Sequence, residues 1–179
     1  MNKARPKLIH LTPSENYESI LKFGIVPTKY FASKGSELRV PVAYFILSHD
    51  IQKWIRWRFY LQWLIHHVSH GGKFPKIAVI SIPIEDLPGN VRKNLYVIDR
   101  FPFQATQHSN SPLYRDPAVR EIYPHTITPL DRYLSDKGLR STYVLPEVIS
   151  FSRVPLPDSH GVRIVSKRRL PWYIFRERL

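Results

Sequence analysis

Two polar side chains near the start of the chain have types and spacing suited to binding a polar ligand. His10 and Thr12 lie two positions apart in the short run 7–12, whose apolar residues predict a strand close to the core. Because successive side chains of a strand point to opposite faces, the imidazole and the hydroxyl project from the same face.

A carboxylate near the other end of the chain is the candidate for catalysis. Glu147 lies in the apolar run 144–151, where a bare carboxylate needs either a partner or a chemical task, because burying it alone is costly. A carboxylate can stabilise positive charge that develops on a sugar ring, and it can also take a proton from an acceptor. The alternative is an exposed glutamate on an edge strand, a position that Pro146 favours.

Hydrophobic periodicity and turn residues predict the elements that must position these groups. The turn residues over 13–16 include a candidate N-cap for the first helix, and residues 48–50 offer N-cap chemistry for a longer one. In chain order, the predicted elements are a strand over 7–12, a helix over 17–23 that ends at Gly24, an extended segment over 25–27, a buried strand over 39–47, a helix over 51–67, a central strand over 77–82, and strands over 95–98, 144–151 and 161–165.

The predicted helix over 51–67 carries an apolar stripe of Trp54, Trp57, Leu61 and Leu64. We interpret this stripe as core, with a base-stacking platform as the alternative. Three basic residues beside it, Lys53, Arg56 and Arg58, are candidates for phosphate contact. The histidines at 66, 67 and 70 lack a carboxylate at ligand spacing, so no metal site is predicted.

Three further segments have compositions that bear on function. The stretch 28–38 is predicted to be a loop, either over a site or on an ordinary surface. The irregular segment 100–143 is rich in proline and tyrosine, and short helices are predicted around 117–122 and 129–134. Long irregular segments in compact domains usually carry function.

The tail 163–179 interleaves aromatic and basic residues, which suits phosphate contact with base stacking, although its aromatics could instead pack on the core. Its basic candidates are Lys167, Arg168 and Arg169.

Composition limits the class of protein. The length of 179 residues predicts one domain over 1–179, and the absence of cysteine excludes disulfides and thiolate metal sites. No apolar run has the form of a signal peptide or a membrane span, so a cytoplasmic protein is expected. The net charge of +13 favours a polyanionic partner such as nucleic acid, unless it reflects compositional bias alone. Glycine-rich dinucleotide and phosphate-binding loops are missing from the sequence.

The run LIHLTPSENYESILKFGIVPT, residues 8–28, resembles the opening of NAD-using ADP-ribosyltransferase-like domains. Those domains often begin with an apolar-apolar-His-x-Thr strand, a short helix and a Gly-Ile/Leu-x-Pro segment. The run is most similar to the DarT-type branch, whose members modify nucleic-acid bases. Residues 145–149 and 153–155 are similar to the strand that carries the catalytic glutamate in the family.

This resemblance implies an α+β fold, an ADP-ribosyltransferase-like split β-sandwich with peripheral helices. It implies NAD as substrate, Glu147 as the catalytic carboxylate and His10 as an NAD-positioning residue. It further implies that 100–143 selects the acceptor, with a DNA base favoured, and it suggests a toxin with an antitoxin or immunity protein as partner. For NAD binding, the resemblance also brings in Thr12, Tyr30, Tyr44 and Ser48. For catalysis beside Glu147 it brings in Arg39, the one arginine from the end of the first predicted strand to the start of the second.

Other functions remain open from the sequence. One is the removal of an RNA 2′-phosphate through NAD on the same fold. Another is a basic nucleic-acid-binding module without enzymatic activity, in which His10 is a core histidine. Protein acceptors are a further alternative, because surface charge does not separate an acidic protein from nucleic acid.

Overall fold

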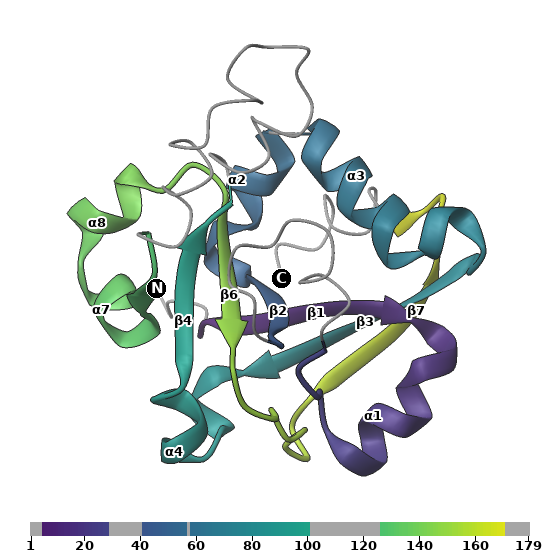
Figure 1. Cartoon of the computed structure of the whole chain (residues 1–179), viewed down its shortest axis with the longest axis horizontal. Helices are drawn as coiled ribbons and strands as arrows, with labels where there is room; N and C mark the ends of the chain where they lie inside the picture. Colours follow the sequence, from purple (N-terminus) through teal and green to yellow (C-terminus); the bar gives the residue numbers. More distant parts are fainter. Residues whose placement is uncertain (1–4, 29–40, 57, 101–125, 171–179) are drawn as a thin grey trace. The chain divides into compact units, whose positions relative to one another are not determined.

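The structure is a computed structural model that describes residues 5–28, 41–56, 58–100 and 126–170, without the side chains of 58–60 and 63 (Figure 1). The chain divides into two compact units. The first consists of Met1–Ile25, Phe45–Pro88 and Val154–Leu179, and the second of Val26–Tyr44 and Gly89–Arg153. That the whole chain forms one domain stays a prediction.

Helices and strands are mixed along the chain, which agrees with the α+β prediction. The strands pair in the order β5-β4-β6-β2-β1-β3-β7, and β2 contributes residues to both units. Their bounds are β1 Lys7–Pro13, β2 Ala43–Leu47, β3 Lys76–Pro83, β4 Leu95–Asp99, β5 Thr128–Pro129, β6 Pro146–Ser150 and β7 Gly161–Ser166. Each predicted strand has a counterpart in the structure, and most of their ends agree within two residues. Of the strand predicted over 39–47, β2 covers Ala43–Leu47, and residues 39 and 40 lie outside the described residues. β5 is an additional, two-residue strand.

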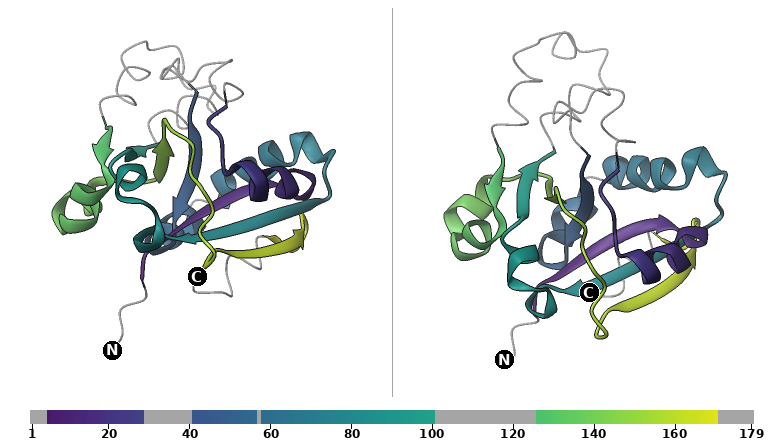
Figure 2. Two further views of the ribbon diagram at one scale, coloured as in Figure 1. Left: turned by 90° about the horizontal axis from the view of Figure 1, so that it is seen from below. Right: turned by 60° about the horizontal axis from the view of Figure 1, so that its bottom comes forward.

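In the first unit, β1 lies between β2 and β3, and β7 pairs with the other side of β3 (Figure 2). All three of these pairings are antiparallel. The apolar residues of β1 and β3 are buried on both faces of the sheet, which explains why their sequences are apolar runs with little alternation. Thr12 is opposite Ala78 and His10 is opposite Ile80 in the register of β1 and β3.

A short helical segment follows β1, as predicted. It consists of the 3-10 helix η1, Ser14–Asn16, and of α1, Tyr17–Phe23. Gly24 ends α1 with φ +73°, a conformation that favours glycine. Asn16, within the predicted turn, occupies the N-cap position of α1, but its side chain makes no cap hydrogen bond. The Asn16 amide donates to the Thr12 hydroxyl at 3.1 Å instead.

Two helices, α2 (Ile51–Arg56) and α3 (Arg58–Val68), occupy the region where the sequence predicts one. They run in different directions (Figure 1), and Trp57 lies outside the described residues. The 3-10 helices η3, Ser48–Asp50, and η4, His70–Gly72, flank the pair. Trp54, Leu61 and Leu64 are buried, which confirms that the described part of the apolar stripe is core.

In the second unit, β4 pairs antiparallel with both β5 and β6. Val42, Ile98 and Ile149 form a buried cluster there, with Tyr44 packed against it. The short helices are η5 Ile84–Asp86, which belongs to the first unit, and α4 Gly89–Arg92, α7 Leu130–Ser135 and α8 Lys137–Thr142 in the second. The sequence predicts α7 but not α8. Among the described helices, none is long and apolar enough to cross a membrane.

Candidate active site

Glu147 is buried in the second unit. It is the second residue of β6, an inner strand with β4 on one side and β2 on the other, and it is only 2% exposed. The alternative reading of the sequence, an exposed glutamate on an edge strand, is therefore wrong. Pro146 does not mark an edge here, because it is the first residue of β6, where the strand tolerates a missing N–H group.

Arg100 is the partner of this carboxylate. Its guanidinium lies 2.5 Å from a Glu147 oxygen, and Arg100 is itself 5% exposed. Ile98 is opposite Glu147 in the register, and the Arg100 N–H group donates to the Leu145 carbonyl at 2.9 Å. Arg100 and Glu147 are thus diagonal neighbours on one face of adjacent strands, a spacing that long side chains can span.

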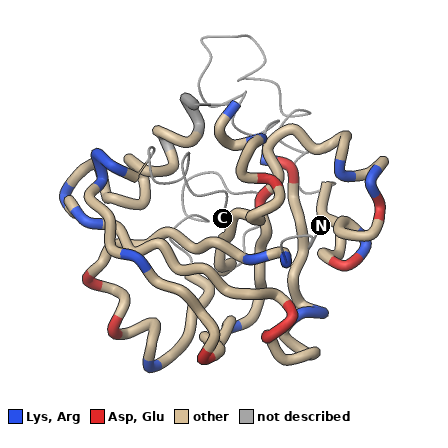
Figure 3. Tube along the Cα trace, turned by 180° about the vertical axis from the view of Figure 1, so that it is seen from behind, with Lys and Arg blue, Asp and Glu red and all other residues tan. Residues whose placement is uncertain are grey.

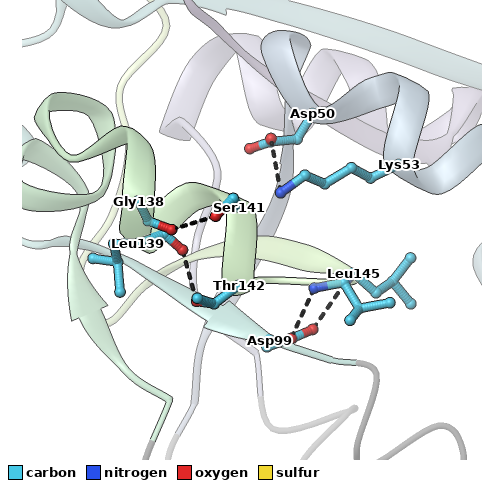
Figure 4. A network of polar contacts seen from close by, with 9 residues as sticks. Asp50, Lys53, Asp99, Gly138, Leu139, Ser141, Thr142 and Leu145 are labelled. Carbon is cyan, nitrogen blue, oxygen red and sulfur yellow. Dashed lines mark hydrogen bonds and ion pairs between the residues drawn. The ribbon is translucent and has the colours of Figure 1, made fainter.

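Asp99 holds the chain immediately before β6 in place. Its two carboxylate oxygens accept hydrogen bonds from the N–H groups of Val144 and Leu145, each at 2.9 Å (Figure 4). The Asp99 N–H group donates to the Thr126 hydroxyl at 2.9 Å. These bonds fix the register of β4 and β6, and the register in turn sets the distance between Arg100 and Glu147.

Tyr44 completes the cluster. The Arg100 guanidinium carbon lies 5.6 Å from the centre of the Tyr44 ring, within the range of a cation–π contact. Tyr44 is half-buried, whereas the charged pair is nearly inaccessible. Tyr44 is therefore the residue of this cluster that solvent reaches most readily.

Burial and ion pairing act in opposite directions on Glu147. Burial raises the pKa of its carboxyl above the ordinary value of 4.5, and the nearby Arg100 guanidinium opposes that rise. Chemically, the cluster offers one carboxylate whose proton affinity is raised, one fixed cation and one aromatic face. We call these three residues, Glu147, Arg100 and Tyr44, the carboxylate cluster.

The N-terminal candidates lie in the first unit, each with its own neighbours. The His10 ring lies 5.5 Å from the Phe45 ring, centre to centre, and is half-buried on β1. The Thr12 hydroxyl accepts from Asn16, and the Ser48 hydroxyl accepts from the Lys7 N–H group at 2.9 Å. Thr12 and Ser48 are buried, so both hydroxyls have structural roles whether or not they bind a ligand.

The other predicted site residues differ in how the structure presents them. Tyr30 and Arg39 lie outside the described residues, as does the side chain of Arg58. Arg56, the last residue of α2, is exposed. Lys167 is half-buried, and Arg168 and Arg169 are exposed in the turn after β7. Within the described part of the chain, no group of histidines and acidic residues is arranged to hold a metal.

The residue that sequence reasoning missed is Arg100. A buried glutamate in an apolar strand indicates a counter-charge somewhere, but the sequence alone does not say which strand lies beside it. The signal in the sequence was the closeness of Arg100 to a predicted strand, because the strand over 95–98 ends two residues before it. Searches of family models, curated proteins and solved structures returned no match.

Proposed function

We propose that the protein transfers ADP-ribose from NAD to a nucleic acid, with a DNA base as the favoured acceptor. In this proposal Glu147 is the catalytic carboxylate, and the fold is the split β-sandwich of ADP-ribosyltransferase-like domains. The observation that supports it is that Glu147, which the sequence resemblance singles out, lies on an inner strand beside a cation and an aromatic ring.

The chemistry of the carboxylate cluster suits this reaction. Transfer breaks the bond between nicotinamide and ribose, and positive charge develops on the ribose ring as the new bond to the acceptor forms. The Glu147 carboxylate would stabilise that charge and take the proton that the acceptor loses. Arg100 would act as a positioning residue, because its ion pair orients the carboxylate. Nicotinamide leaves as the second product.

The NAD-binding roles rest on the resemblance. We propose that Tyr44 or Tyr30 stacks on nicotinamide, and that Arg39 contributes to catalysis. His10 would position NAD, with Thr12 and Ser48 in supporting positions. For Tyr44, the half-buried position of the residue and the contact of its ring with Arg100 add a structural reason.

The test is to incubate the full chain with labelled NAD and with DNA or RNA oligonucleotides, and to measure label on the polymer and free nicotinamide. A general acid–base contribution is worth about 10²–10⁴-fold, so Glu147→Gln should lose transfer by at least about 10²-fold. Glu15→Gln, which changes an exposed glutamate of η1, is the matched control and should transfer normally. Folding of both variants is checked by circular dichroism.

Two outcomes would overturn the proposal. If the wild type neither labels any polymer nor releases nicotinamide, the protein does not have the proposed activity. Release of a 2′-phosphate from a phosphorylated RNA, without label on a base, would assign the related 2′-phosphotransferase reaction instead. A thermal-shift titration with NAD, with His10→Ala beside the wild type, tests the cofactor separately from the acceptor.

One observation favours a second candidate, a nucleic-acid-binding module without catalysis. Glu147 and Arg100 are nearly inaccessible and paired with each other, which is how a structural ion pair in a core also looks. In that case polynucleotide binding should be tight and should weaken with salt, while NAD leaves the melting temperature unchanged.

A further inference from the structure

The β7 strand forms the outer edge of the first unit's sheet. It pairs with β3 through the register Lys76↔Ser166 to Ser81↔Gly161, and within the described part of the chain no strand follows it. Five of its six residues are exposed. An edge strand with free main-chain groups is a template for pairing with another chain.

The main-chain groups that β7 directs outward can be assigned from one hydrogen bond. The Lys167 N–H group donates to the Pro75 carbonyl at 2.8 Å, so Lys167 belongs to a hydrogen-bonded position of the β3–β7 ladder. Such positions alternate along an antiparallel pair, so the next ones are Val165 and Arg163. The N–H and C=O groups of Val162 and Ile164 therefore point away from β3.

The same two residues present apolar side chains to solvent. Val162 is 36% exposed and Ile164 is 48% exposed, and they share one face of β7 because they lie two positions apart. Natural edge strands are often protected by proline, lysine or a bulge. β7 has no proline, its one charged side chain is Arg163, and its pairing with β3 is continuous over all six residues.

Basic residues gather at the Ser166 end of this edge, and Figure 3 shows the distribution of charge along the trace. Four of the residues from 161 to 170 are basic and none is acidic, and the neighbouring stretch 73–83 adds two lysines without an acidic residue. The cations at this end of β7 are Lys73, Lys76, Lys167, Arg168 and Arg169, of which all but the half-buried Lys167 are exposed.

We propose that β7 is a docking edge for an extended, acidic segment of a partner protein, which adds to the sheet as a further strand. Its acidic residues would lie near the Ser166 end, and its apolar side chains would cover Val162 and Ile164. A peptide fits better than a nucleic acid, because the edge presents alternating donors and acceptors. A phosphate backbone supplies acceptors alone, whereas an extended peptide supplies both. This inference is independent of the proposed transferase activity.

The experiment uses the full chain and a fluorescent synthetic peptide with an aspartate block at one end followed by alternating valine and threonine. Binding is followed by fluorescence anisotropy at low and high salt, and should weaken as salt rises. Two further peptides carry N-methyl groups on every second amide of the alternating part, in opposite phases. One phase should lose binding by about tenfold or more, which is 1.4 kcal/mol or more, and the other should retain it.

Variants of the protein test the same edge by changing β7 in place of the peptide. Ile164→Pro removes an outward N–H group while leaving the hydrogen bonds to β3, and proline is accepted at such edge positions, so it should fold and lose peptide binding. Ile164→Thr keeps the N–H group and should retain measurable binding. Should Ile164→Pro fail to fold, the two methylated peptides still decide the question.

Three results would overturn the proposal. Equal binding of both methylated peptides would show that charge alone holds the peptide. Displacement of the peptide by a single-stranded oligonucleotide, combined with unchanged binding by Ile164→Pro, would assign the edge to nucleic acid. Sedimentation that shows a dimer in the wild type and a monomer for Ile164→Pro would assign it to a second copy of the chain.

Discussion

The Arg100 guanidinium and the Glu147 carboxylate meet 2.5 Å apart on adjacent strands, and both side chains are almost fully buried. Neither charge has ready access to water, so each depends on the other for stabilisation. Removing one partner of a buried pair is therefore more damaging than replacing both.

Replacing one member of the pair should destabilise the second unit strongly. We expect Arg100→Met to lower the free energy of unfolding by about 3–5 kcal/mol, because the Glu147 carboxylate is left buried without its cation. Adding Glu147→Leu to that variant should restore a large part of the loss. Urea unfolding, monitored by circular dichroism, measures the free energy of unfolding of both variants. Arg168→Met, at an exposed position, is the control, and its free energy of unfolding should lie within about 0.5 kcal/mol of the wild-type value. A loss under about 1 kcal/mol for Arg100→Met would contradict the pairing.

Stability should depend on pH through Glu147. The pKa of this carboxyl is raised in the folded chain by burial, so the folded state binds its proton more tightly than the unfolded state does. The contribution of Glu147 to the free energy of unfolding is fully present below its pKa in the unfolded chain, near 4.5. This contribution is lost as the pH rises through the pKa of the folded chain. The unfolding free energy of the wild type minus that of Glu147→Gln should accordingly fall as pH increases across this window. A difference that rises with pH would mean that Arg100 outweighs burial.

Asp99 should matter for stability through its two main-chain hydrogen bonds. In Asp99→Asn the side-chain NH₂ group would face one of the N–H donors of Val144 and Leu145, so one bond is lost and two donors oppose each other. We expect a loss of about 1–3 kcal/mol, measured by urea unfolding. Asp136→Asn is the matched control, because Asp136 accepts from the Leu139 N–H group at an exposed helix N-cap, where asparagine serves equally well. Equal effects of the two substitutions would refute the special role of Asp99.

Gly24 should not tolerate a side chain. Its φ of +73° is unfavourable for other residues, and a Cβ atom would lie 2.7 Å from the Val154 carbonyl oxygen. The same segment holds two main-chain bonds between Ile25 and Val154, so the backbone has little room to move. We expect Gly24→Ala to destabilise the chain by about 1–3 kcal/mol, visible as a lower melting temperature. Gly89→Ala, in α4 with open space around it, should be neutral or slightly stabilising, and a similar drop for both variants would argue against this explanation.

Local pattern was enough to predict most of the strands. The run over 7–12 and the run over 77–82 contain β-branched and apolar residues bounded by turn residues, and both form strands where expected. Gly24 marked the end of α1 for the same local reason, since a glycine can adopt positive φ there. These features depend on neighbours in the sequence, which is the information that a pattern contains.

The sequence did not predict which groups the side chains contact. Asn16 has the right type for a helix cap, but its amide donates to Thr12 instead. Ser48 likewise accepts from Lys7, which is 41 residues earlier in the chain. The ion pair of Glu147 required knowledge that β4 lies beside β6. Contacts of this kind are set by strand pairing, and pairing follows from the packing of the whole unit.

Each unit draws on segments that are distant in the chain, and this affects how the protein emerges from the ribosome. All of the second unit, up to Arg153, is synthesised before β7 appears, while β3 has been made much earlier. Until translation reaches Gly161, the apolar strand β3 has one open side that could pair with another nascent chain. The arrival of β7 shields that side, so chains that stall or are cut before it should be prone to aggregation.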